Sequence, residues 1–215
     1  LVVWQPSSLK LGAPGGPFSA GANLEAAMPL FMKHGAAGIE PFVKSFQDTM
    51  MRVKYAHVPV VCAISGIALG GGCELSLHAA KRVAAIESYI GLVEVGIGLL
   101  PAGGGLKEAA ARAAKGLKLS GGTNYVDFVK QPFEQAAMAK ISSSAHEALA
   151  MGYLKSDDII VANVHELLYH AQQAVIAMSI AGYRPPLKSL IPVGGRSLIS
   201  TVMGQVVNLR DGQFI

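Results

Sequence analysis

Residues 59–75 read Pro59-Val60-Val61-Cys62-Ala63-Ile64-Ser65-Gly66-Ile67-Ala68-Leu69-Gly70-Gly71-Gly72-Cys73-Glu74-Leu75. Residues 59–64 are apolar and rich in β-branched side chains, which is typical of a strand covered on both faces. Residues 65–72 predict a loop that ends in three glycines, and residues 73–80 predict a helix. The stretch therefore predicts a buried strand that leads through a tight turn into a helix.

The segments on either side extend this pattern to an α/β fold. A second strand is expected at 82–87, so strand, glycine-rich turn, helix and strand follow one another as in a βαβ unit. We expect Pro29 to kink or end a short helix that begins after Asn23, and Pro41 to begin the next helix. Further helices are expected from near 103 and at 133–140, 145–151, 163–181 and 197–208, with a short strand at 1–4. We divide the chain into a core at 1–160 and a C-terminal helical region and tail at 161–215.

Composition limits the possible functions. The chain has 215 residues, of which 51% are hydrophobic and 15% charged, so a disordered chain is excluded. The net charge of +4 suits an acidic ligand such as a nucleotide-bearing cofactor, but the Lys and Arg residues are scattered, which argues against nucleic acid. Two cysteines are too few for a disulfide framework or a zinc site and favour a cytoplasmic location. We expect no signal peptide and no membrane-spanning segment.

The glycine turn suggests a site for a polarised oxygen. Glycines allow the backbone to approach a ligand closely, and the first N–H groups of a helix have no partner within it. These N–H groups could polarise a thioester carbonyl placed at Gly70-Gly71-Gly72 and stabilise an enolate oxygen. The same glycines could equally serve only to make a tight turn.

Two glutamates add acid–base chemistry to this turn. Glu74 lies in the first turn of the predicted helix, where it could also be a simple capping residue. Glu94 is flanked by apolar residues and could otherwise be an exposed loop acid. A carboxyl in apolar surroundings has a raised pKa, and a neighbouring carboxylate raises it further. Such a pair can keep one acid protonated beside one ionised base.

At these residues the sequence resembles the crotonase superfamily of enoyl-CoA hydratases and isomerases. The matching motifs are 18–24 (Phe-Ser-Ala-Gly-Ala-Asn-Leu), the whole of 59–75, 91–94 (Gly-Leu-Val-Glu) and 100–105 (Leu-Pro-Ala-Gly-Gly-Gly). The likeness extends to about residue 160, and its central block is highly specific. It implies a crotonase-like spiral of stacked ββα turns with C-terminal helices.

The resemblance also implies the residue roles. The N–H groups of Ala22 and Gly71 would form an oxyanion hole, and Glu74 and Glu94 would hold the attacking water, with Glu94 supplying the proton at the α-carbon. The other substrate-binding candidates are Ala20, Gly21, Asn23, Gly70, Gly72, Pro101 and Gly103. Members that only shift double bonds often lack the first acid, so both acids favour hydration of trans-2-enoyl-CoA in fatty acid β-oxidation. No metal and no cofactor is implied beyond the coenzyme A of the substrate, and the expected assembly is a homo-oligomer, a trimer or hexamer.

The sequence departs from the family in three places. Leu106 follows Gly104-Gly105 where the family usually has Thr, which would reshape the acyl pocket. From the resemblance we expect that the first strands of the domain, which help to bind coenzyme A in the family, are missing. The tail at 184–214 looks like the C-terminal end of a bifunctional protein in which a 3-hydroxyacyl-CoA dehydrogenase half precedes the hydratase. No strand-linked G-x-G-x-x-G occurs, so hydride transfer is not expected in this part.

Three alternatives stay open beside hydration. The chain could be a double-bond isomerase, or an inactive acyl-CoA-binding module of a larger protein. A serine peptidase would require His57 or His78 to activate Ser65, but no acidic partner is placed for such a triad. A zinc site at His165 and His170 is rejected, because a separation of five residues turns the two rings about 140° apart on a helix.

Overall fold

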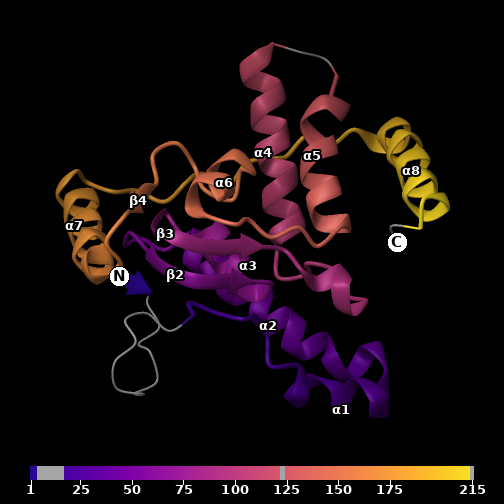
Figure 1. Cartoon of the computed structure of the whole chain (residues 1–215), viewed down its shortest axis with the longest axis horizontal. Helices are drawn as coiled ribbons and strands as arrows, with labels where there is room; N and C mark the ends of the chain where they lie inside the picture. Colours follow the sequence, from indigo (N-terminus) through magenta and orange to yellow (C-terminus); the bar gives the residue numbers. More distant parts are fainter. Residues whose placement is uncertain (4–16, 122–123, 214–215) are drawn as a thin grey trace.

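The computed structural model describes residues 1–3, 17–121 and 124–213, and at its centre is a parallel sheet in the order β1-β2-β3-β4 (Figure 1). The strands are β1 (Val2–Val3), β2 (Val61–Leu69), β3 (Lys81–Gly91) and β4 (Ile159–Val161). Helix α3 (Gly71–His78) joins β2 to β3, which confirms the predicted βαβ unit. The other α-helices are α1 (Leu24–His34), α2 (Ala36–Lys54), α4 (Gly105–Ser120), α5 (Val126–Ala137), α6 (Ala145–Ala150), α7 (Leu167–Ile180) and α8 (Gly195–Asp211). Short 3-10 helices span Glu94–Ile97 and Val164–Glu166.

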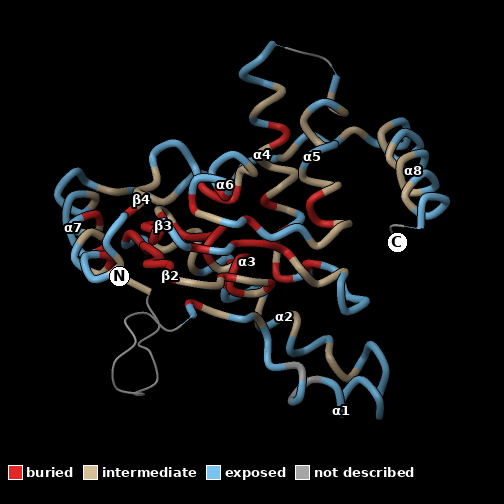
Figure 2. Tube along the Cα trace, in the orientation of Figure 1, coloured by how far each residue is buried: buried red, intermediate tan, exposed pale blue. Residues whose placement is uncertain are grey.

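The two faces of the sheet build two apolar clusters. Successive side chains of a strand point to opposite faces, so Cys62 and Ile64 pack with α3 and α6 while Val61 and Ala63 pack with α7. Figure 2 shows the buried residues concentrated on β2, β3 and α3. The sheet is therefore covered on both sides, as the apolar run of β2 predicted, and α3 is held against one face.

Strand β2 continues five residues beyond its predicted end at Ile64. The prediction of a loop from Ser65 onward was wrong, because Gly66 to Leu69 pair with β3 after a register shift between Ile64 and Gly66. The segment at 18–19 lies on the other side of this extension. Phe18 donates its backbone N–H to the Ser65 carbonyl at 2.9 Å, and Leu69 donates to the Ser19 carbonyl at 2.9 Å. These bonds bring the residues after Ser19 to the end of β2.

Prolines produced the errors in the predicted helices. Pro29 lies inside α1, which continues to His34, and Pro41 lies inside α2, which begins at Ala36. Helix α5 begins at Val126 rather than at 133, with Pro132 inside it. A proline removes one backbone donor but does not forbid a helix whose other residues are paired. Helices α6, α7 and α8 confirm the segments expected at 145–151, 163–181 and 197–208, and no helix among the described residues is long and apolar enough to cross a membrane.

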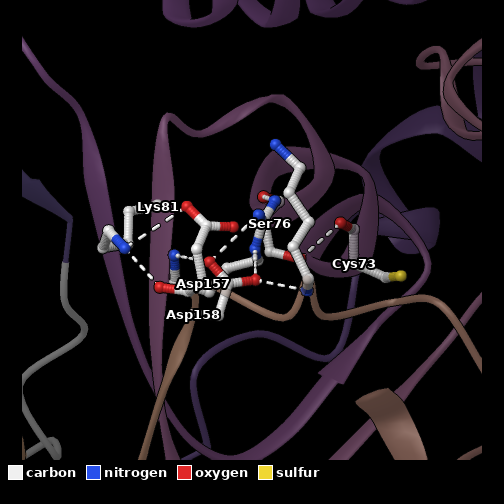
Figure 3. Close-up of polar contacts among 7 residues, drawn as sticks. Cys73, Ser76, Lys81, Asp157 and Asp158 are labelled. Carbon is white, nitrogen blue, oxygen red and sulfur yellow. Dashed lines mark hydrogen bonds and ion pairs between the residues drawn. The ribbon is translucent and has the colours of Figure 1, made fainter. Parts of the chain in front are cut away.

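A buried ion pair connects β3 to the loop before β4. Arg82 is fully buried, and its Nε donates to Asp158 Oδ2 at 2.6 Å while its Nη1 donates to the Ser76 carbonyl at 3.1 Å. Asp158 also accepts from the backbone N–H groups of Arg82 and Lys155. Figure 3 shows Asp158 beside Ser76 of α3, with Lys81 reaching the neighbouring Asp157. The pair thus ties α3, β3 and the β4 loop together at one point.

Candidate active site

Strand β2 and helix α3 meet at Gly70. This residue has a φ of 51°, a backbone conformation that side-chain-bearing residues rarely adopt, and its N–H donates to the Gly91 carbonyl at 3.0 Å. Its carbonyl accepts from the Glu74 N–H at 2.9 Å, which begins α3. The N–H of Gly71 therefore stands at the positive end of a helix and makes no backbone hydrogen bond within the described residues.

A second amide faces the same space. A Cβ atom placed on Gly71 would lie 3.8 Å from the Ala22 nitrogen, and one on Gly21 would lie 3.6 Å from the Gly71 nitrogen. The Ala22 N–H, like that of Gly71, has no backbone acceptor in the described ranges. Two amide groups from segments about fifty residues apart in sequence thus lie near each other, and an oxyanion hole needs two such donors.

Glu74 is almost fully buried beside these donors, with 2% of its surface exposed. Its Oε1 accepts the backbone N–H of Gly105 at 2.8 Å. A Cβ atom on Gly103 would come within 2.4 Å of Oε2, so the glycines of the 103–105 turn make room for the carboxyl. Burial raises the pKa of Glu74 from 4.5 to about 7, the bond from Gly105 opposes this rise, and the Glu94 charge adds to it.

Glu94 approaches the same turn from the 3-10 helix at Glu94–Ile97. Its Oε1 would lie 3.4 Å from a Cβ atom on Gly70, which places the carboxyl next to the end of β2. Its Oε2 is buried and has no hydrogen-bond partner within the described part of the chain. Burial raises the pKa of Glu94 above its usual value. An unpaired buried carboxyl oxygen is costly, and it is available to a bound molecule.

Both acids line one cavity of about 170 Å³. Of the residues that the sequence singled out, the cavity wall includes Ala20, Gly21, Ala22, Gly70, Gly71, Glu74, Glu94 and Gly103. Three candidates do not line it. Gly72 instead packs against Ser19, where a Cβ atom would come within 2.4 Å of the Ser19 Cβ; Pro101 is buried nearby, and Asn23 is exposed.

Sequence reasoning missed the opposite wall of the cavity. Helix α2 contributes Ile39, Phe42, Val43 and Phe46, and the loop after Glu94 contributes Ile97, Leu99 and Leu100. The Gln47 amide of α2 donates to the Ala102 carbonyl at 2.8 Å, which holds this loop against the helix. The helical spacing of apolar residues in α2 was visible in the sequence. That spacing does not show whether the apolar face of the helix covers a cavity or packs into the core.

One histidine of the peptidase alternative, His78, and one of the rejected zinc site, His170, have other partners. The ring nitrogens of His78 lie 2.7 Å from the Glu74 carbonyl oxygen and 2.9 Å from the Lys107 Nζ, and burial lowers its pKa. His170 lies 3.6 Å from Glu166 on its own helix. Within the described ranges, no three His, Cys, Asp or Glu side chains gather as a metal site would require.

The sequence is similar to a family model and to several known proteins. A family model described as enoyl-CoA hydratase/isomerase matches residues 11–117. A Bacillus subtilis protein named "Probable 3-hydroxyacyl-CoA dehydrogenase" is 40% identical over 189 residues, covering 88% of this chain and 23% of that protein. The human mitochondrial methylglutaconyl-CoA hydratase is 39% identical over 90 residues, covering 42% of this chain and 25% of its own length. This chain therefore matches only about a quarter of the length of either relative.

Among solved structures, an enoyl-CoA hydratase subunit I of Geobacillus kaustophilus superposes with a TM-score of 0.60 at 23% identity. The match covers 99% of this chain and 67% of that one. At this level of identity the likeness shows a shared fold.

Proposed function

The chain belongs to the enoyl-CoA hydratase/isomerase family and has the crotonase fold, and from this premise we propose that it adds water to trans-2-enoyl thioesters of coenzyme A. The product would be a 3-hydroxyacyl thioester, as in fatty acid oxidation. One observation carries the proposal. Two carboxyls with raised pKa values, Glu74 and Glu94, line one cavity beside the amides of Ala22 and Gly71.

The amides support the first half of the reaction. The thioester carbonyl oxygen would accept the N–H groups of Ala22 and Gly71. As the water oxygen bonds to C3, the C2=C3 electrons move toward the carbonyl, and negative charge grows on that oxygen. Preorganised donors at the start of α3 stabilise this charge more than they stabilise the substrate, and each is worth on the order of 10²–10³ in rate.

The carboxyls support the proton transfers. In our proposal the Glu74 carboxylate accepts the proton that water loses, and the Glu94 carboxyl donates a proton to C2. The net result is addition of H and OH across the double bond, after which a proton returns from Glu74 to Glu94. Each carboxyl is desolvated, which raises its pKa, and the charge of Glu94 raises the pKa of Glu74 further, so one acid and one base can coexist near neutral pH.

Disappearance of the enoyl-thioester absorbance tests the proposal when crotonyl-CoA is added to the purified chain. We expect the absorbance to fall and the product to weigh one water more than the substrate. A chain that leaves crotonyl-CoA unchanged but converts 3-enoyl-CoA into 2-enoyl-CoA would be an isomerase instead. Calorimetric binding of thioesters without any turnover would make it a binding module and contradict the proposal.

We further propose that the chain is the hydratase part of a longer protein with a 3-hydroxyacyl-CoA dehydrogenase part. The name and greater length of the Bacillus relative support this, and the proposed product is the substrate class that such a dehydrogenase oxidises. The chain alone should reduce no NAD⁺ when supplied with 3-hydroxybutyryl-CoA. A longer protein containing it should do so, and failure of that protein would refute the fusion without affecting hydration.

Self-association is the remaining part of the proposal. Helix α1 contacts α2 and leaves large apolar side chains exposed, including Met28, Phe31 and Met32. Exposed apolar clusters of this kind often mark contacts between chains. We expect a trimer or hexamer by light scattering after size exclusion. A monomer at micromolar concentration would contradict this expectation.

A further inference from the structure

Arg112 of α4 is half-buried, and one nitrogen of its guanidinium is buried without a partner among the described residues. Among the described residues, its Nη2 has no hydrogen-bond partner, and none of the ion pairs includes Arg112. The guanidinium of Arg82 differs from that of Arg112, because it is fully buried and donates hydrogen bonds to Asp158 and to the Ser76 carbonyl. A buried donor nitrogen without a partner is unfavourable, because it has lost its hydrogen bonds to water. Its burial also lowers the pKa of Arg112, which shows the same desolvation.

Arg112 lines a second cavity, of about 220 Å³. This cavity lies between α4, α5 and the residues that follow α6, and it does not include either catalytic glutamate. Gly105 belongs to its wall and donates its N–H to Glu74, which lines the first cavity, so one hydrogen bond joins the walls of the two cavities. The second cavity is thus a separate space next to the candidate active site.

The other walls define what could pair with the guanidinium. Most are apolar, including Leu77, Ala109, Phe128, Pro132 and Met151. The polar exceptions are Asp127, Gln131, Gln135 and Tyr153. Tyr153 and Gln131 already donate to backbone carbonyls, at 3.5 and 3.4 Å, and Asp127 is exposed. A half-buried cation in a mostly apolar wall fits a ligand with one anionic end and a short hydrocarbon body.

We propose that this cavity binds a short aliphatic carboxylate. One or both carboxylate oxygens would accept N–H groups from Arg112, and the alkyl chain would pack against Leu77, Ala109 and Phe128. Arginine suits this task because its planar guanidinium matches the geometry of a carboxylate. Such a ligand would satisfy the unpaired donor and fill apolar space at once, which inorganic phosphate could not do.

Isothermal titration calorimetry with sodium butyrate tests the proposal, with Arg112→Met as the main variant. The wild-type chain should bind butyrate, and the variant should lose at least about tenfold in affinity, because hydrogen bonds to a charged group are worth about 1.5–3 kcal/mol. The neutral analogue butyramide and inorganic phosphate should bind more weakly than butyrate. Wild-type protein that binds no butyrate at millimolar concentration would overturn the proposal, and so would equal binding by Arg112→Met, which would place the ligand elsewhere.

Thermal unfolding separates a binding role from a structural one. Without ligand, Arg112→Met should unfold at the same or a higher temperature, because it removes a buried nitrogen that has no partner among the described residues. Butyrate should raise the unfolding temperature of the wild type and not that of the variant. If Arg112→Met fails to fold, Asp127→Asn is the second variant. Removing this carboxylate from the cavity wall should tighten butyrate binding. Weakened binding would mean that Asp127 does not repel a bound anion, and this would contradict the proposed site.

Discussion

The backbone N–H of Gly105 donates to the Oε1 of Glu74 at 2.8 Å, so the start of α4 holds the carboxyl that the start of α3 carries into the cavity. This bond favours the ionised carboxyl, but burial outweighs it and raises the pKa of Glu74 to about 7. The turn at 103–105 therefore fixes the position of an acid whose protonation changes near neutral pH.

The raised pKa of Glu74 predicts a pH-dependent stability. Its folded value of about 7 exceeds the ordinary 4.5, so between these values the folded state binds more protons than the unfolded chain. The stabilising contribution of Glu74 to the free energy of unfolding is fully present below about pH 4.5 and is lost as the pH rises through about 7. In Glu74→Gln, the change in the free energy of unfolding over this pH range should be smaller than in the wild type by up to about 3 kcal/mol. Urea unfolding of both proteins at about pH 5 and about pH 8 measures it; parallel pH profiles would contradict the expectation.

Gly103 predicts a steric test of the cavity. A Cβ atom there would lie 2.2 Å from Phe46 Cε1 and 2.4 Å from Glu74 Oε2. Gly103→Ala should cost about 1–3 kcal/mol of stability and displace the acid, with a loss of at least about tenfold in kcat/KM. Gly204→Ala in α8 is the matched control, since a Cβ atom there meets nothing within 4 Å and should stabilise the helix by about 0.5–1 kcal/mol. Equal activity of both variants would exclude the proposed packing of Gly103.

The sequence predicted the part of the site that lies on one continuous stretch. The buried strand, the glycine turn and Glu74 follow each other at 61–74, and a local pattern suffices to place them. Glu94 could be selected because apolar residues surround it. In contrast, the extension of β2 beyond Ile64 depends on the segment at 18–19, which pairs with it from far away in the sequence.

The features that the sequence did not reveal depend on tertiary packing. An apolar stripe on α2 looks the same whether it covers a core or a cavity, so Phe46 could not be assigned to the site. Proline disfavours the interior of a helix, but Pro41 lies inside α2 and Pro132 lies inside α5. Arg112 has no distinctive sequence neighbours, and what makes it unusual is its buried Nη2, which has no partner among the described residues and belongs to a side chain that lines a cavity.

The Arg82–Asp158 pair predicts a strong effect at a site remote from the cavity. Asp158→Asn leaves the buried guanidinium of Arg82 without its carboxylate, which should cost about 3–5 kcal/mol. Asp157→Asn is the matched control, because Asp157 is exposed and its pair with Lys81 should contribute less than about 1 kcal/mol. Chemical denaturation of both variants measures the difference. Similar losses for the two would mean that burial does not decide the strength of these pairs.

The two cysteines are expected to be unreactive in the folded protein. Cys62 and Cys73 are fully buried, and burial raises the pKa of the Cys62 thiol to about 12 and that of Cys73 as well. Since the thiolate is the reactive form, Ellman's reagent should react with neither until the chain is unfolded. Rapid labelling of Cys73 under native conditions would show that α3 opens readily.

The central claim is that Glu74 and Glu94 together carry out hydration in the cavity that they share. Turnover of crotonyl-CoA by Glu74→Gln and Glu94→Gln, with the exposed Glu87→Gln as control, tests it most directly. Each cavity variant should lose at least about 10²-fold in kcat while keeping the wild-type fold, and Glu87→Gln should retain full activity. Either cavity variant that remains as active as the control would contradict the account.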